Sequence, residues 1–191
     1  MTIAPPCCEC GRPMPDGPAA AKRVGEVFRP DVSGLTLFGS DQQARETVQA
    51  ALESHKAELH DIANYIHANP ELCYKEVKAH AKITEYLSSL GYTVESFEKY
   101  PTAFKVSYTR GNGGRVFGLN SEYDALPEIG HACGHNLIAI CGIGAFLAMR
   151  AAMDKHQIDG TVTLIGTPAE EGGAGKVRLY EIGACEYCRS M

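Results

Sequence analysis

The segment TVTLIG at 161–166 is the sequence feature that most constrains the fold of this chain. It is the most strongly β-forming stretch, and its nearly continuous apolar run is typical of a strand that is covered on both faces. Such a strand needs packed layers on either side of its sheet. Helical and strand patterns alternate along the rest of the chain. The sequence therefore predicts an α/β fold class with three layers.

Helical periodicity predicts three longer helices. Apolar residues recur at helical spacing from about residue 41, with Ser40 or Asp41 as the cap, until the Asn69-Pro70 pair. The residue before a proline avoids helical geometry, so the first helix should end there. The others are expected at 76–90, closed by Gly91, and at 138–153, with Asn136 as N-cap and small residues for close packing against a sheet.

Strand patterns appear before and after the third helix. Alternating residues predict strands at 92–97 and 104–108, and GNGG at 111–114 is expected to be a hairpin turn into a strand at 115–120. The two ends of the chain lack such patterns. We expect 1–40 to be a disordered or loosely docked leader, and 185–191 to be a divergent tail.

Composition excludes several classes of protein. A net charge of -5 and a pI near 5.8 argue against nucleic-acid binding. No apolar run long enough for a membrane span is expected, and the N-terminus lacks the apolar core of a signal peptide. A cytoplasmic protein with reduced thiols is the default expectation. C-x-x-C pairs at Cys7/Cys10 and Cys185/Cys188 are too far apart in sequence for a zinc ribbon and are expected to be free thiols.

Two acidic segments are expected to face each other. Glu122 and Asp124 follow one predicted strand, and Glu170 and Glu171 follow TVTLIG. In α/β sheets ligands bind at the carboxyl ends of the strands, so this edge is the predicted site. In extended chain the two adjacent glutamates would point in opposite directions.

Cys133 and His135 flank a single glycine just before the third helix. In a turn both could reach one ion, and the helix start would favour the Cys133 thiolate; thiolate and imidazole are typical zinc ligands. The alternative is a small core cysteine and a hydrogen-bonded histidine at a helix start. The Glu170–Glu171 pair favours the metal site, because one carboxylate could bind the ion while the other accepts a proton.

With these residues in hand, the chain resembles the peptidase M20 family, in its amidohydrolase branch. The resemblance is carried by NPEL at 69–72, YDALPEIGHACGHN at 123–136 and GTPAEEGG at 166–173, and it covers about 41–183. The last two motifs are nearest to the dipeptidase-like and aminobenzoyl-glutamate hydrolase-like members. The resemblance implies that 41–184 is the N-terminal part of a zinc-peptidase-like catalytic domain, incomplete at its C-terminus and without a lid or dimerisation domain.

The resemblance also implies roles for individual residues. Cys133, His135 and Glu171 would bind metal, with zinc in a two-metal site and manganese or cobalt as possible substitutes. Glu170 would be the general base, and Asp124 would orient the site. His131 is expected to make a structural hydrogen bond in preference to the alternative, metal ligation. The substrate would be a small dipeptide or N-acyl amino acid, and full-length family members would form homodimers.

Family members continue beyond the position of Gly183 to supply two further ligand histidines, which this chain does not contain. We therefore expect a metal-dependent amide-bond hydrolase that is weakly active or inactive as this chain. One alternative is a non-catalytic truncated paralogue that binds metal or a protein partner. Another is a cysteine hydrolase with Cys133 as nucleophile and His131 or His135 as base.

Overall fold

The computed structural model describes residues 41–184. The predicted leader, the predicted tail and both C-x-x-C pairs lie outside the described residues. All described residues belong to one compact unit. In chain order the elements are α1 (Asp41–Ser54), α2 (Lys56–Ala68), α3 (Val77–Ser89), β1 (Val94–Phe97), β2 (Tyr100–Arg110), β3 (Arg115–Glu122), α4 (His135–His156), β4 (Gly160–Thr167), α5 (Glu170–Gly173) and α6 (Gly175–Glu181).

The sheet places β4 in its interior, in the order β1-β2-β4-β3. β4 runs antiparallel to β2 and parallel to β3. The predicted hairpin at 111–114 is therefore wrong, because β2 and β3 do not pair and β4 lies between them. The physical reason is burial. Seven of the eight residues of β4 are buried, so the most apolar strand takes an interior position and separates two neighbours in sequence.

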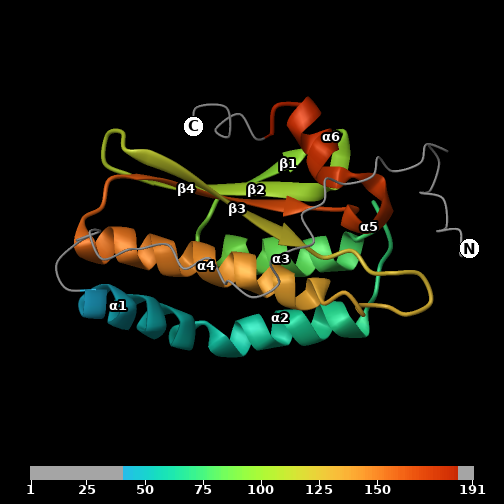
Figure 1. Cartoon of the computed structure of the whole chain (residues 1–191), viewed down its shortest axis with the longest axis horizontal. Coiled ribbons are helices and arrows are strands. Elements are labelled where there is room, and N and C mark those ends of the chain that lie inside the picture. Colours follow the sequence, from blue (N-terminus) through green and yellow to red (C-terminus); the bar gives the residue numbers. More distant parts are fainter. Residues whose placement is uncertain (1–40, 185–191) are drawn as a thin grey trace, which may run out of the picture. The chain divides into compact units, whose positions relative to one another are not determined.

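Helices cover the sheet in layers, which confirms the α/β fold class (Figure 1). α3 and α4 lie on one face, where Phe104, Val106 and Leu164 join the main core cluster. The short helix α6 lies on the opposite face, where Leu179 packs with Ala103 and Ile165. The interior strand is thus covered on both faces, as its sequence predicts.

α1 and α2 form a further helical layer on the far side of α4 (Figure 1). The single helix predicted from about 41 to 68 is in fact two helices, because the chain turns at His55 (φ -111°, ψ 5°). α4 is long and apolar enough to cross a membrane by length and composition, contrary to expectation. The same properties belong to a core helix, and ten of its 22 residues are buried.

Helix α4 packs so closely on β3 that one glycine of α4 has no room for a side chain. A Cβ at Gly142 would collide with Ser121 Oγ and would lie 2.5 Å from the backbone oxygen of Asn120. Overpacking against backbone costs about 1–3 kcal/mol, more than the helix propensity that alanine adds. Gly142→Ala should therefore lower the free energy of unfolding by about 1–3 kcal/mol, measured by urea denaturation.

Gly144→Ala, on the same helix, is the matched control. Its Cβ would meet only the side-chain ends of Leu52, at 3.2 Å, and Leu59, at 3.5 Å. Because side chains can move, this variant should be as stable as the parent or more stable by up to about 1 kcal/mol. Equal stability of the two variants would contradict the close contact between α4 and β3.

His80 on α3 is expected to make stability depend on pH. Burial lowers the pKa of His80 below its ordinary value of 6.5, opposed by the backbone of Ala103. Its Nε2 has no hydrogen-bond partner among residues 41–184, and its ring lies edge-on to Phe104. The unfolded chain therefore binds the proton more readily, so stability should be lost as the pH falls below 6.5. His80→Phe should lose less stability than the parent over that range in thermal denaturation.

Candidate metal centre

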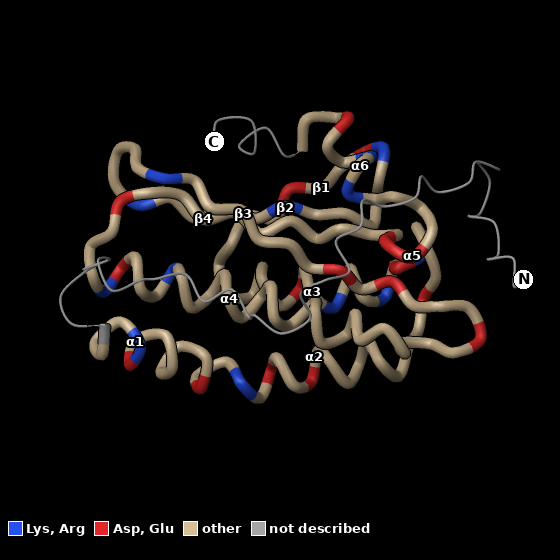
Figure 2. The backbone as a smooth tube through the Cα atoms, viewed as in Figure 1, with Lys and Arg blue, Asp and Glu red and all other residues tan. Residues whose placement is uncertain are grey.

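The carboxyl ends of β3 and β4 bring both acidic segments to one edge of the sheet. These strands are parallel neighbours, and Glu122, the last residue of β3, pairs in register with Thr167, the last residue of β4. Asp124 follows β3, while Glu170 and Glu171 follow β4. Acidic positions gather where these strands end, beside α5 (Figure 2). The predicted position of the two acidic segments, at the carboxyl ends of neighbouring strands, is confirmed.

A left-handed glycine lets Cys133 and His135 approach the same point. Gly134 has φ 82° and ψ 22° and forms the N-cap of α4, which begins at His135. No atom lies within 4 Å of a Cβ built there, so the backbone angle, rather than space, requires glycine. The expectation that Asn136 caps the helix is wrong. Asn136 lies inside α4, and its Nδ2 lies 3.4 Å from the carbonyl oxygen of Ala63.

A second left-handed residue, Ala169, turns the chain after β4. Its φ is 58° and its ψ is 47°, a left-handed conformation that costs an L-residue about 1–2 kcal/mol. Ala169 is the N-cap of α5, a helix of a single turn. Glu170 and Glu171 therefore lie in a helical turn, not in extended chain. The expectation that they point in opposite directions is wrong, because both carboxylates approach His135.

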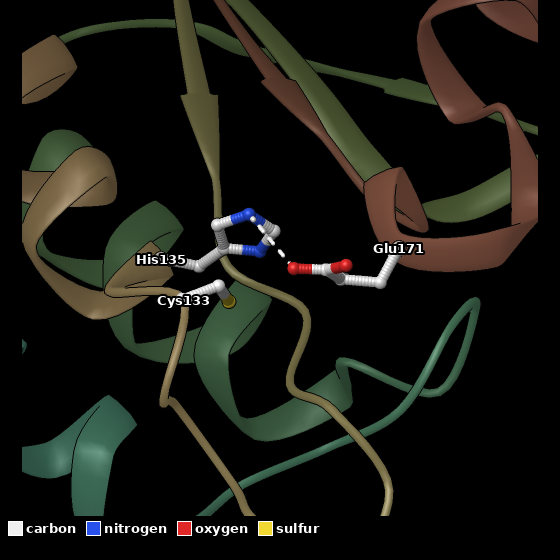
Figure 3. Close-up of side chains that lie close together, drawn as sticks. All are labelled: Cys133, His135 and Glu171. Carbon is white, nitrogen blue, oxygen red and sulfur yellow. Dashed lines mark ion pairs between the residues drawn. The ribbon is translucent and has the colours of Figure 1, made fainter. Parts of the chain in front are cut away.

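His135 lies at the centre of the site (Figure 3). Its Nε2 lies 3.3 Å from Glu122 Oε2, 3.6 Å from Glu170 Oε2 and 3.7 Å from Glu171 Oε1. The imidazole is 4% exposed, whereas Glu170 is 41% and Glu171 22% exposed. The close-up shows Cys133 and His135 projecting from the start of α4 toward Glu171 on the facing turn.

Two overlapping sets of donor atoms could each hold a cation. Cys133, His135 and Glu171 offer ligand atoms within 4.8 Å of one another, and so do Glu122, His135 and Glu170. The first set combines sulfur, imidazole nitrogen and carboxylate oxygen, which suits zinc. The structure thus brings together all three residues predicted as ligands, and the cluster fits a metal ion.

Asp124 holds both sides of this cluster in place. It is fully buried, and its Oδ1 lies 2.9 Å from His135 Nδ1, which is also 2.7 Å from the Asp124 carbonyl oxygen. Its Oδ2 accepts a hydrogen bond of 2.9 Å from the backbone N–H of Glu171. Because the Asp124 carbonyl oxygen can only accept a hydrogen bond, His135 Nδ1 carries the proton, and the lone pair of Nε2 faces the carboxylates. The orienting role of Asp124 stays a prediction, and this geometry supports it.

The thiol of Cys133 is held in its protonated form by its neighbours. Desolvation and the carboxylate of Glu171 raise the pKa of Cys133, and the backbone of His135 opposes them only partly. The helix start acts in the predicted direction, through the backbone of His135, but desolvation and then Glu171 outweigh it in the protein without metal, so the net pKa of Cys133 is raised. A bound cation would reverse this balance by binding the thiolate.

His131 lies close to His67, near the end of α2. It is 8% exposed, and its ring centroid is 6.4 Å from that of His67. Desolvation lowers the pKa of His131, as do His135 and His67, while the Ile66 backbone opposes the decrease. Neither ring nitrogen makes a hydrogen bond of normal geometry within 41–184, so the expected structural hydrogen bond is not found there.

The sequence left two glutamates near the site without a predicted role. Glu122 was placed at the predicted edge because it follows a strand, but no part in the chemistry was predicted for it. Its side chain is only 12% exposed, its Oε2 lies 3.3 Å from His135 Nε2, and its Oε1 accepts hydrogen bonds from Lys176 and Asn120. Glu76, fully buried behind α5, carried no signal, because a glutamate at a helix start normally faces solvent.

Comparisons with known proteins identify the family of this site. Residues 118–189 match Peptidase family M20/M25/M40. The chain is 37% identical over 171 residues to the Xaa-Arg dipeptidase of Mus musculus, covering 84% of this chain and 40% of that protein. It is 31% identical over 160 residues to a component of the p-aminobenzoyl-glutamate hydrolase of Escherichia coli, covering 74% and 33%. The chain thus spans two fifths or less of the length of these relatives.

Solved structures show the same fold. A putative aminohydrolase from methicillin-resistant Staphylococcus aureus aligns with a TM-score of 0.63 and 26% identity, over 72% of this chain and 39% of that one. The Bacillus subtilis YXEP protein, described as a dinuclear metal binding peptidase from the M20 family, aligns with a TM-score of 0.57 and 27% identity, over 68% and 40%.

Proposed function

Because this chain contains a peptidase M20 family domain, we propose that it belongs to a metal-dependent hydrolase of amide bonds in small substrates. The observation that supports this most strongly is the convergence of Cys133, His135 and Glu171 within 4.8 Å, with a second glutamate beside them. The relatives named as a dipeptidase and an aminobenzoyl-glutamate hydrolase both act on amide bonds. We propose dipeptides or N-acyl amino acids as the substrate class.

Glu171 is the better candidate for the ligand, and Glu170 for the general base. The backbone N–H of Glu171 is held by buried Asp124, and its carboxylate contacts Cys133. Glu170 is nearly twice as exposed, at 41% against 22%, so its carboxylate is open to an incoming substrate. A fixed carboxylate suits metal binding, while an accessible one suits proton transfer.

Each residue then has a defined part in the reaction. A cation held by Cys133, His135 and Glu171 would polarise the substrate carbonyl and make water a stronger nucleophile. Glu170 accepts the proton of the attacking water and returns it to the leaving amine nitrogen. Asp124 keeps the His135 ring oriented throughout through its contacts at Nδ1.

The test combines metal binding with hydrolysis. The purified protein is depleted of metal, titrated with Zn²⁺ and assayed with dipeptides and N-acyl amino acids before and after adding a chelator. We expect zinc to bind and any hydrolysis to be lost with the chelator and restored by zinc.

Two outcomes would contradict the proposal. Hydrolysis that survives chelation but is lost on mild alkylation would identify a cysteine hydrolase using Cys133. Zinc binding with no cleavage of any substrate, by the protein as its own cells make it, would identify a metal-binding protein without catalysis.

A further inference from the structure

We propose that Glu76 is a positioning residue of the metal centre, whose one carboxylate ties together the two segments that carry the site residues. This inference rests on the proposed metal-dependent function. Glu76 lies at the start of α3 and is completely buried. It does not touch the donor atoms, and it acts through the backbone that carries them.

The first connection runs to the turn that carries the glutamates. Glu76 Oε1 accepts a hydrogen bond of 2.9 Å from the backbone N–H of Ala169, the left-handed residue directly before Glu170. The same oxygen accepts a bond of 2.9 Å from Tyr74 N–H, and the Tyr74 hydroxyl donates to the Gly173 carbonyl at 2.6 Å. Both ends of α5 are thus held by the segment that precedes α3.

The second connection runs to the residues that hold His135. Glu76 Oε2 accepts a hydrogen bond of 2.9 Å from Thr102 Oγ1 on β2. The Thr102 carbonyl in turn accepts a hydrogen bond from the hydroxyl of Tyr123, which is fully buried. The next residue, Asp124, contacts both His135 Nδ1 and Glu171 N–H. Glu76 is therefore linked to both sides of the cluster.

Burying the Glu76 carboxylate is unfavourable in free energy, which supports a specific positioning role for it. Burial raises the pKa of Glu76, and the hydrogen bonds to Thr102, Ala169 and Tyr74 oppose that rise. Within residues 41–184 no lysine, arginine or histidine forms an ion pair with it. A buried acid satisfied mainly by backbone and hydroxyl donors fixes the distance between the segments that supply those donors.

The experiment measures Co²⁺ binding to the metal-depleted protein, by the absorption bands of cobalt and of its bond to the Cys133 thiolate. Glu76→Ala removes both connections and should weaken Co²⁺ binding by about 10–100-fold, the range typical of residues behind metal ligands. Glu76→Gln keeps an oxygen that can accept from Ala169 and Tyr74, and its amide can donate to the Thr102 hydroxyl, so it should keep the Co²⁺ affinity and the spectrum of the parent. Should Glu76→Ala fail to fold, Glu76→Asp, shorter by one methylene, takes its place.

Thr102→Val cuts only the second connection and leaves Ala169 held, so it should weaken Co²⁺ binding less than Glu76→Ala does. Thr163→Val is the matched control, because it removes the hydrogen bond between the buried Thr163 hydroxyl and Ser107, which does not involve Glu76; it should lower the free energy of unfolding but keep the parent's Co²⁺ affinity. Parental affinity and spectrum in Glu76→Ala or Glu76→Asp would overturn the inference, and so would an equal loss in Thr163→Val. Failure of the parent protein itself to bind Co²⁺ would overturn the proposed function instead.

Discussion

Glu170→Gln is expected to abolish nearly all amide hydrolysis, lowering kcat by about 10²–10⁴-fold, the contribution typical of general acid–base catalysis. Glutamine preserves the size of the side chain but cannot accept the proton of the attacking water. The carboxylate of Glu170 is the more exposed of the adjacent pair, and it lies 3.6 Å from His135 Nε2. The rate is measured with any substrate that the parent protein cleaves.

Zinc affinity separates this role from metal binding. Glu170→Gln should bind zinc as the parent does, because Cys133, His135 and Glu171 are unchanged. Glu181→Gln is the matched control on α6, where the carboxylate pairs with Arg178 at the surface, and its rate should equal that of the parent. A large loss of zinc affinity in Glu170→Gln would show instead that Glu122, His135 and Glu170 form the metal site.

His135→Ala is expected to have the largest effect on metal binding, weakening zinc affinity by more than the roughly 100-fold upper range of residues behind the ligands. His135 is the only residue shared by the two donor sets found in the described part of the chain. Its removal disables both sets, whichever one the metal uses. Affinity is measured by competition with a chromophoric chelator.

Two further variants show which of the two sets of donor atoms binds the metal. Glu171→Gln should weaken zinc binding more than Glu122→Gln, because Glu122 already pairs with Lys176 and Asn120. His60→Ala is the control for histidine removal, since His60 lies on the exposed face of α2 beside Asn64. Unchanged zinc affinity in His135→Ala would refute the proposed metal centre.

Much of the fold could be predicted from local pattern. Periodicity located α3, α4 and β4 to within a few residues, and burial of β4 followed from its apolar run. Strand pairing could not be predicted, because local sequence does not record which strand lies between two others. The failed hairpin at 111–114 is the example, since competition for the sheet interior brought β4 between β2 and β3.

The candidate site, like the fold, could be predicted only in part from the sequence. The residue types and their place after parallel strands determined that Cys133, His135, Glu170 and Glu171 could form a metal centre, because thiolate, imidazole and carboxylate groups carry their chemistry wherever they lie. The sequence alone did not show that Ala169 would turn both glutamates toward His135.

Only the tertiary structure decided how these groups are held. Glu122 faces His135 because Lys176, 54 residues away in sequence, holds its other oxygen. Glu76 meets Ala169 across 93 residues. Such contacts arise when distant segments are packed into one core, where a buried polar group must find a partner whatever its distance along the chain. The sequence therefore determined which chemical groups the site contains, while the packing of distant segments determined how those groups are arranged.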